Sequence, residues 1–350
     1  MLPIILIAFI SLIILLTLHE FSHFIMAKKF GVEVQEFGIG YPPKLIGKKF
    51  KDTIYSLNLI PFGAFIKVNE KDLKNKPIWQ RGVIISAGIV SFWIISAVII
   101  SLIFYIGAPA QVLDEEINLK DPKVQIVSVV PDSPAGQVNL QIGDTIQKLE
   151  INDQELIINK IGQVQTFTEQ NKGKEVVLTI MRGNEVLEIN IIPRVSPPQG
   201  QGSLGIGLAR TAIKKYSFFQ AIWQGILTTI NLTWQIILGL YQIFKNLILR
   251  KPSGAEIMGP VGIMDIFVKA GSLGFIYFLQ TIALISLNVA VINALPIPVV
   301  DGGRLAFLAL EKIRKKPLSD QTEQKINAVF FLLLILMMVF VTAKDIGRLF

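Results

Sequence analysis

The chain has 350 residues, of which 51% are hydrophobic, and its mean hydropathy is +0.55. This composition lies beyond the usual range of soluble proteins and indicates an integral membrane protein. The formal net charge is +8, but the basic residues cluster in particular loops and form no stripe on a polar fold, so membrane topology explains them better than nucleic-acid binding does. The absence of cysteine excludes disulfides and thiolate metal ligands.

Four apolar segments are long enough to cross a bilayer, because a helical span needs about 20 residues. They comprise about Leu2–Ala27, Gly82–Gly107, Ser272–Leu295 and Ile326–Ala343. The first segment could be read as a signal peptide, but no basic residue precedes its apolar stretch and no small-residue cleavage site follows it. The sequence therefore predicts a polytopic α-helical membrane protein with about four transmembrane helices.

The only two histidines of the chain lie in the first apolar segment, in the pentapeptide His19-Glu20-Phe21-Ser22-His23. Residues i and i+4 share a helix face, so both imidazoles can reach one ion while Glu20 addresses a water on it. The bland alternative is a buried helix whose histidines merely hydrogen-bond, but this leaves Glu20 without a partner in lipid. The pentapeptide therefore predicts a zinc site with Glu20 as the general base.

The loop after this span, residues 28–81, carries eleven Lys and Arg residues. The positive-inside rule places it in the cytoplasm, together with the basic segment after the third span, and so places both termini and the middle of the chain outside. Within the loop, Val32–Phe37 and Thr53–Val68 have strand character and predict a β-hairpin around Gly38–Pro43. Ile54–Val68 is apolar enough to enter the membrane where protein covers its backbone, although a plain surface hairpin also fits.

The middle of the chain, residues 111–195, is polar and rich in strand patterns, which predicts a small extramembrane α+β domain. The Pro- and Gly-rich residues Ser196–Gly207 predict a linker. Phe218–Leu249 is apolar but interrupted by glutamines and asparagines, so it is either a fifth span or an amphipathic helix at the membrane surface. A fifth crossing would separate Asp301 from His19 across the bilayer, and we therefore predict the interfacial helix. The predicted domains are 1–110 (membrane part with the hairpin), 111–195, 196–271 (linker and interfacial helix) and 272–350 (C-terminal membrane part).

A third zinc ligand must come from another segment, and the best candidate is Asp301 in the segment Asn293–Gly303, which reads NALPIPVVDGG. Pro296 and Pro298 end the third span, and the glycines after Asp301 let the chain turn before the next helix. Asp301 alone could equally be a helix N-cap. Beside a two-histidine site that lacks a ligand, coordination is the better interpretation.

Two asparagines of the third span are candidates for contact with a substrate. Asn293 could hydrogen-bond the substrate backbone or a developing oxyanion, and Asn288, one to two turns earlier, could serve as well. A polar contact between helices explains Asn288 equally well and Asn293 less well.

These motifs together resemble one known family. HEFSH in the first span, NALPIPVVDGG after the third and the SPA…GD pattern within Ser133–Asp144 are similar to the site-2 protease family of intramembrane zinc metalloproteases. The likeness covers most of the chain and is greatest to the bacterial regulator-of-sigma-E type, which has one PDZ domain. It implies a Zn²⁺ site formed by His19, His23 and Asp301, with Glu20 as general base and Asn293 assisting binding or catalysis.

The resemblance also implies a substrate and a location. Pro61–Lys67 resembles the family's membrane-associated β-hairpin, which is thought to hold substrate as an added strand, so Gly63, Ala64 and Phe65 become candidate substrate-binding residues. The family cleaves transmembrane segments of proteins that another protease has already trimmed, such as anti-sigma factors and remnant signal peptides. The implied location is the inner (cytoplasmic) membrane, with a PDZ-like domain outside that filters substrates by size.

The chain departs from the family pattern at three places, none of which is a presumed ligand. Ala64-Phe65 stands where Gly-Tyr is usual, Ala87-Gly88-Ile89 where Ala-Gly-Pro is usual, and Val300 where Leu is usual. Two other function classes stay open. A PDZ-bearing binding protein with a dead metal site is disfavoured by the intact Glu20, and a metal transporter should carry more intramembrane ligands.

Overall fold

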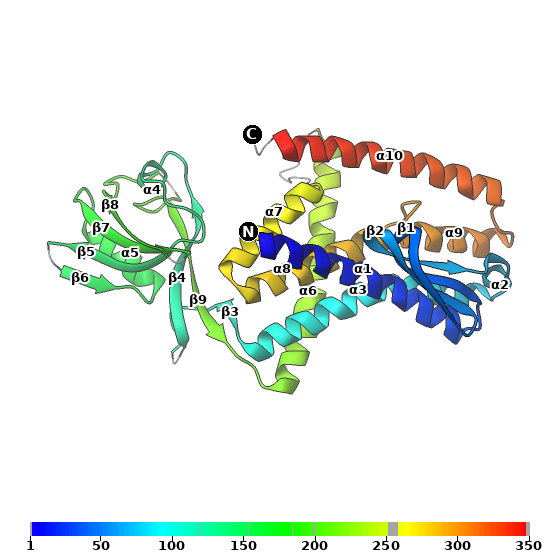
Figure 1. Cartoon of the computed structure of the whole chain (residues 1–350). Coiled ribbons are helices and arrows are strands. Elements are labelled where there is room, and N and C mark those ends of the chain that lie inside the picture. Colours follow the sequence, from blue (N-terminus) through cyan, green and yellow to red (C-terminus); the bar gives the residue numbers. More distant parts are fainter. Residues whose placement is uncertain are drawn as a thin grey trace. The chain divides into compact units, whose positions relative to one another are not determined.

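The computed structural model describes residues 2–117, 119–152, 154–183, 185–198, 200–250 and 258–347 (Figure 1). It consists of two compact units. The first is formed by Met1–Leu102 together with Ile222–Phe350, and the second by Ile103–Ala221. The residues proposed to act on a metal all belong to the first unit.

Within the described residues, five helices are long and apolar enough to cross a membrane, judged by length and composition. Four of them coincide with the predicted spans. The chain is therefore a multi-pass membrane protein, and the number of crossings stays a prediction. The five helices are α1 (Leu2–Lys29), α3 (Ile78–Ile106), α6 (Phe218–Ile248), α8 (Phe275–Ala294) and α10 (Asp320–Gly347).

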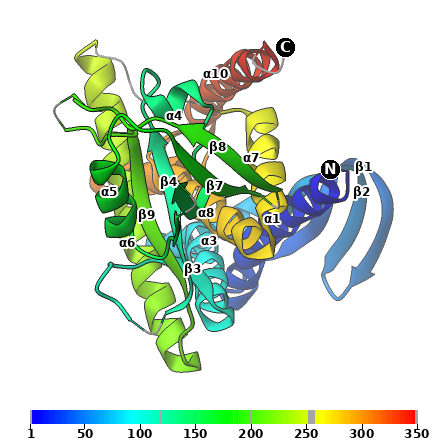
Figure 2. The same cartoon turned by 90° about the vertical axis from the view of Figure 1, so that its left-hand side faces the viewer.

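Helix α6 differs from the other four in its course. It runs crosswise to α1, α3 and α8 in both views (Figures 1 and 2). Small residues allow it to approach α3 closely: Thr229 is fully buried, and a side chain at Gly225 would overlap Ser101 of α3. Trp93 Nε1 also donates to Thr233 Oγ1 over 3.2 Å. The position of α6 along the membrane surface stays a prediction.

Helices α3 and α8 are joined by buried serines. Ser286 Oγ donates to Phe92 O at 2.7 Å, and Ser96 Oγ donates to Ala283 O at 3.0 Å, both across the helix interface. Such short polar side chains let helices pack closely while satisfying their own hydroxyls. Helix α7 (Pro260–Leu273) packs against α1 and α8 through the fully buried Phe267. These contacts hold α1, α3 and α8 as one bundle.

The predicted hairpin is present as β1 (Val34–Phe50) and β2 (Thr53–Val68). β1 continues through Pro42-Pro43, where the sequence predicts a turn, because pairing resumes beyond the prolines at Lys44 with Asn58. The first half of β1 lies between the two halves of β2, so that Phe37 is paired with both Ile66 and Tyr55. The second half of β2 therefore forms one edge of this small sheet. A short helix, α2 (Glu70–Lys74), follows.

The second unit is an α+β domain built on an antiparallel sheet of order β3-β9-β4-β5-β7-β8, with β6 paired to β5. Its interior is a cluster of aliphatic side chains, among them the fully buried Leu149 and Leu178. Its elements are β3 (Ala108–Gln111), β4 (Lys120–Val129), α4 (Pro134–Gln137), β5 (Thr145–Ile151), β6 (Gln154–Ile157), α5 (Ile161–Gln170), β7 (Val176–Arg182), β8 (Glu185–Ile191) and β9 (Ile206–Lys214).

Strand β9 lies almost wholly after the predicted linker and outside the predicted domain 111–195, and β3 begins three residues before that domain. Both strands belong to the sheet because β9 pairs with β4 on one side and with β3 on the other. The SPA…GD motif has a structural role here. Ser133 Oγ accepts a hydrogen bond from Gly136 N at the start of α4, and buried Asp144 accepts two hydrogen bonds from Arg182, at 2.8 and 2.7 Å.

Candidate metal centre

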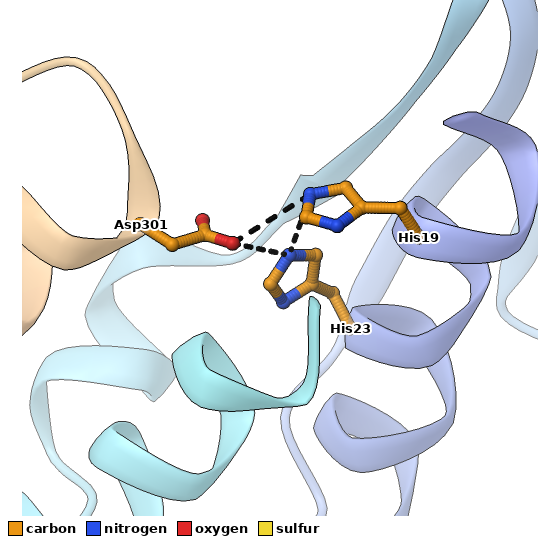
Figure 3. Close-up of side chains that lie close together, drawn as sticks. All are labelled: His19, His23 and Asp301. Atoms are coloured by element: carbon orange, nitrogen blue, oxygen red, sulfur yellow. Dashed lines mark hydrogen bonds and ion pairs between the residues drawn. The ribbon is translucent and has the colours of Figure 1, made fainter. Parts of the chain in front are cut away.

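Helix α1 places the two histidines on one face, as their spacing predicts. His19 and His23 are both buried, and their Nε2 atoms lie 3.3 Å apart (Figure 3). The apolar run around them makes α1 helical throughout, and residues four apart on a helix lie one turn above each other. The imidazoles therefore point their Nε2 atoms at the same volume.

Asp301 completes this cluster from a distant part of the chain. It is the first residue of α9 (Asp301–Arg314), and its Oδ2 lies 3.6 Å from His19 Nε2 and 3.4 Å from His23 Nε2 (Figure 3). Oδ2 is buried and has no hydrogen-bond donor at ordinary geometry among the described residues. Val300, rather than Asp301, occupies the N-cap position of α9, so the N-cap alternative for this aspartate has no support.

The three atoms have the separations that a tetrahedral zinc site requires. Zinc binds imidazole nitrogen and carboxylate oxygen at about 2.0–2.1 Å, so two ligands of a tetrahedral ion lie about 3.3–3.4 Å apart. The separations of 3.3, 3.4 and 3.6 Å are close to this value and exceed the length of about 2.7–2.9 Å usual for a charge-assisted hydrogen bond. The donor set of two imidazoles and one carboxylate fits a catalytic zinc, which keeps its fourth position open.

Helix α3 contributes three residues, spaced four apart, that lie against the cluster. Ile84 O lies 2.8 Å from His23 Nδ1 and accepts a hydrogen bond from it, which keeps the proton on Nδ1 and leaves Nε2 free for a metal. The ring of Phe92 stacks on His19 with ring centroids 4.6 Å apart. Between them, Gly88 leaves the space that the ligands occupy. The sequence predicts no role for these three residues, although a glycine inside an apolar helix can mark a close approach.

Replacing Gly88 by alanine should therefore destroy the metal site. A Cβ at this position would overlap His19 Cε1 and His23 Nε2 and would lie 2.7 Å from Asp301 Oδ2. We expect Zn²⁺ affinity to fall by more than the roughly 10- to 100-fold loss that outer-shell substitutions cause. The measurement is metal competition with a chromophoric chelator on the purified protein.

The same helix offers a control for this substitution. Gly82 has no atom within 4 Å of its Cβ position, so Gly82→Ala adds the same methyl group to α3 without a clash. We expect its zinc affinity to equal that of the wild-type protein. Equal zinc affinity for Gly88→Ala would contradict the placement of the cluster against α3.

Glu20 lies beside the cluster without belonging to it. Its Oε1 is 4.0 Å from His19 Nε2, and its side chain is 25% exposed, more than those of the three cluster residues. A carboxylate at this position can reach a water at the cluster while leaving the donor set complete.

The two asparagines bond within their own helix, α8. Asn293 is half-buried and its Nδ2 donates to Val289 O at 3.0 Å, whereas Asn288 is exposed and donates to Leu284 O at 2.9 Å. In the part of the chain that the structure describes, no hydrogen bond joins either asparagine to the cluster. Their roles toward substrate stay predictions.

The hairpin brings its candidate residues next to α1. Gly63 and Ala64 are buried and Phe65 is half-buried. The Cβ position of Gly63 is 3.4 Å from Leu16, which shares a face of α1 with Glu20 one turn later. The second half of β2 thus runs along the helix that carries the histidines.

Comparison with known proteins identifies the family. Residues 7–337 match the model of peptidase family M50. A Clostridium perfringens protein with the curated name "Putative zinc metalloprotease" is 32% identical over 349 residues, which cover 97% of each chain. Zinc metalloprotease RasP of Oceanobacillus iheyensis is 27% identical, covering 96% of this chain and 97% of its own, and regulator of sigma-E protease RseP of Escherichia coli is 26% identical, covering 97% of each. The chain therefore belongs to peptidase family M50, the site-2 proteases, and is a zinc metalloprotease.

Proposed function

We propose that this protein is an intramembrane zinc endopeptidase whose metal ligands are His19, His23 and Asp301. The observation that carries the proposal is the cluster itself: three buried donor atoms from two distant segments converge at separations suited to tetrahedral zinc. Two of the three donor atoms belong to residues in the C-terminal half of a long apolar helix. Ionisable groups are costly at membrane depth unless they pair with one another or bind an ion.

Zinc held by His19, His23 and Asp301 would supply a Lewis acid that polarises the scissile carbonyl and acidifies a water toward a pKa of about 7. Glu20 would accept a proton from the attacking water and deliver it to the leaving nitrogen. Ile84 O holds His23 in the tautomer that presents Nε2. Asn293 is positioned on α8, the helix that leads to Asp301, and would bond the substrate backbone.

The substrate must meet this site as an extended chain, since a helix hides its carbonyls in its own hydrogen bonds. The second half of β2 is suited to bind an extended segment. One of its edges pairs with β1, its other edge is the edge of the sheet, and the strand runs along α1. We propose that Gly63, Ala64 and Phe65 accept a substrate segment as an added strand. Asn288 is the weakest of the proposed substrate contacts, because its side chain is exposed and satisfied within α8.

The substrates we propose are transmembrane segments of proteins already trimmed by another protease, such as anti-sigma factors and remnant signal peptides. The name of the Escherichia coli relative, regulator of sigma-E protease, supports the first kind. The second unit would act as a PDZ-like domain that excludes substrates whose outer domain is intact. Its antiparallel sheet, with α5 beside it, suits peptide capture at a strand edge.

The experiment that tests the proposed function compares the wild-type protein with its Glu20→Gln variant on a membrane-embedded reporter substrate. Proteolysis by the wild type alone supports the endopeptidase. A protein that binds stoichiometric zinc but cuts no substrate would favour the alternative, a catalytically inactive membrane binding protein.

The orientation we propose places the hairpin in the cytoplasm and the second unit and both termini outside. Its support is the concentration of eleven Lys and Arg residues in 28–81. A reporter fused near Lys48 should therefore read cytoplasmic, and one fused near Asn152 should read external. The reverse pattern would contradict the charge argument.

A further inference from the structure

Arg81 lies on the face of α3 that contacts the metal cluster. It precedes Ile84 by three residues, Gly88 by seven and Phe92 by eleven, and residues at these intervals lie along one side of a helix. The three later residues contact His19, His23 and Asp301 as described above. Arg81 is directed at another element, the helix α9.

The contact between Arg81 and α9 is a bidentate ion pair. Arg81 Nη1 and Nη2 donate to the two carboxylate oxygens of Glu311 at 2.8 and 2.9 Å, across 230 residues of sequence. Both side chains are largely buried, at 15% and 16% exposure. Paired hydrogen bonds of this kind fix direction as well as distance, and partial burial protects them from screening.

This ion pair gives α9 a second point of attachment to α3. The first is at the metal cluster, where Asp301 meets Gly88. Glu311 lies ten residues, or about 15 Å, along α9 from Asp301, and Arg81 lies seven residues, or about 10 Å, back along α3 from Gly88. A helix attached at one point can pivot, whereas attachment at two points sets its direction. The direction of α9 decides where its first side chain, Asp301, points.

The turn before Asp301 needs such support. Val299 has a φ of +84°, which for a β-branched residue is a strained conformation costing about 1–3 kcal/mol. The backbone also closes tightly, because a Cβ at Gly302 would overlap Leu295 O and one at Gly303 would overlap Ile297 O. A strained turn persists only where contacts outside it hold its ends.

We infer that Arg81 and Glu311 are a positioning pair, which holds α9 in the direction that presents Asp301 Oδ2 to the two imidazoles. This inference rests on the proposed role of Asp301 as a zinc ligand. Loss of the pair should leave all three ligands in the chain but loosen their convergence. Zinc affinity should then fall by roughly 10- to 100-fold, the usual effect of removing a group that orients a ligand.

The test measures zinc affinity by chelator competition and the visible spectrum of the Co²⁺-substituted protein, which reports tetrahedral coordination. Glu311→Gln keeps the shape of the side chain and removes its charge, and Arg81→Lys keeps the charge and removes the fork. We expect both to weaken metal binding and lower the tetrahedral absorption. The exchanged pair Arg81→Glu with Glu311→Arg should recover most of the loss, because it re-forms the ion pair between α3 and α9. The free energy of unfolding, measured on the same variants, shows whether metal binding changes beyond what destabilisation explains.

The exposed ion pair between Lys74 and Asp320 provides the control. Its atoms are 2.6 Å apart, and it involves neither α3 nor α9. Asp320→Asn should leave zinc affinity and the Co²⁺ spectrum unchanged. Wild-type metal binding by Glu311→Gln, or an equal loss in Asp320→Asn, would overturn the positioning pair. Zinc retained by Asp301→Ala would instead overturn the ligand assignment beneath it.

Discussion

Glu20→Gln should reduce proteolysis by roughly 10²- to 10⁴-fold while the protein keeps its zinc. Glutamine has the shape of glutamate but cannot take a proton from water at neutral pH, so the step that generates the nucleophile loses its base. Glu20 lies outside the three-atom cluster, with Oε1 4.0 Å from His19 Nε2, so the donor set is unchanged. The measurement is cleavage of a membrane-embedded reporter substrate, with zinc content determined on the same preparations.

A matched substitution separates this effect from a general loss of charge. Glu70 is exposed at the start of α2, and the Glu70→Gln protein should cleave the reporter substrate as fast as the wild type. Equal rates for the wild-type and Glu20→Gln proteins would remove Glu20 from the mechanism. Loss of zinc from Glu20→Gln would mean that this carboxylate is a ligand instead of the base.

Asp301→Ala should abolish both zinc retention and proteolysis. The substitution leaves two neutral imidazoles, which supply neither a third ligand nor the negative charge that partly compensates Zn²⁺ in a buried site. The affinity loss should exceed the roughly 10- to 100-fold cost of losing an outer-shell partner. Metal content after dialysis and the rate of substrate cleavage measure the two effects.

The control for Asp301 is another aspartate of the first unit. Asp265 pairs with Lys269 on the exposed side of α7, at 2.7 Å, and Asp265→Asn should keep zinc and activity. An active, zinc-bound Asp301→Ala protein would show that the third ligand was chosen wrongly. His19→Ala and His23→Ala should then still lose the metal, because they supply the remaining nitrogen donors.

Most of the candidate site was predictable because its signals are local. The spacing of His19 and His23 is a helical turn, and long apolar runs mark the helices that carry them. Asp301 was predictable from the prolines and glycines around it, combined with the need for a third ligand. The N-cap alternative for Asp301 could be dismissed only when α9 was seen to begin at this residue.

The contributions of α3 could not be predicted in the same way. Ile84 acts through its backbone carbonyl, which every residue has, and Gly88 acts through the absence of a side chain. Neither function leaves a pattern of residue types in one sequence. Strand β9 was missed for a similar reason, because it follows a Pro- and Gly-rich stretch and its place depends on pairing with β4, about 80 residues earlier in the chain.

The amino-acid sequence by itself determined the long apolar helices and the histidine pair with a glutamate beside it, because hydropathy and periodicity act over one or a few helical turns. The tertiary structure alone decided how three segments meet: the convergence of Asp301 on the histidines, the clearance at Gly88 and the ion pair of Arg81 with Glu311. These contacts join residues far apart in the chain. Their geometry follows from the packing of whole helices, which no local pattern of residues specifies.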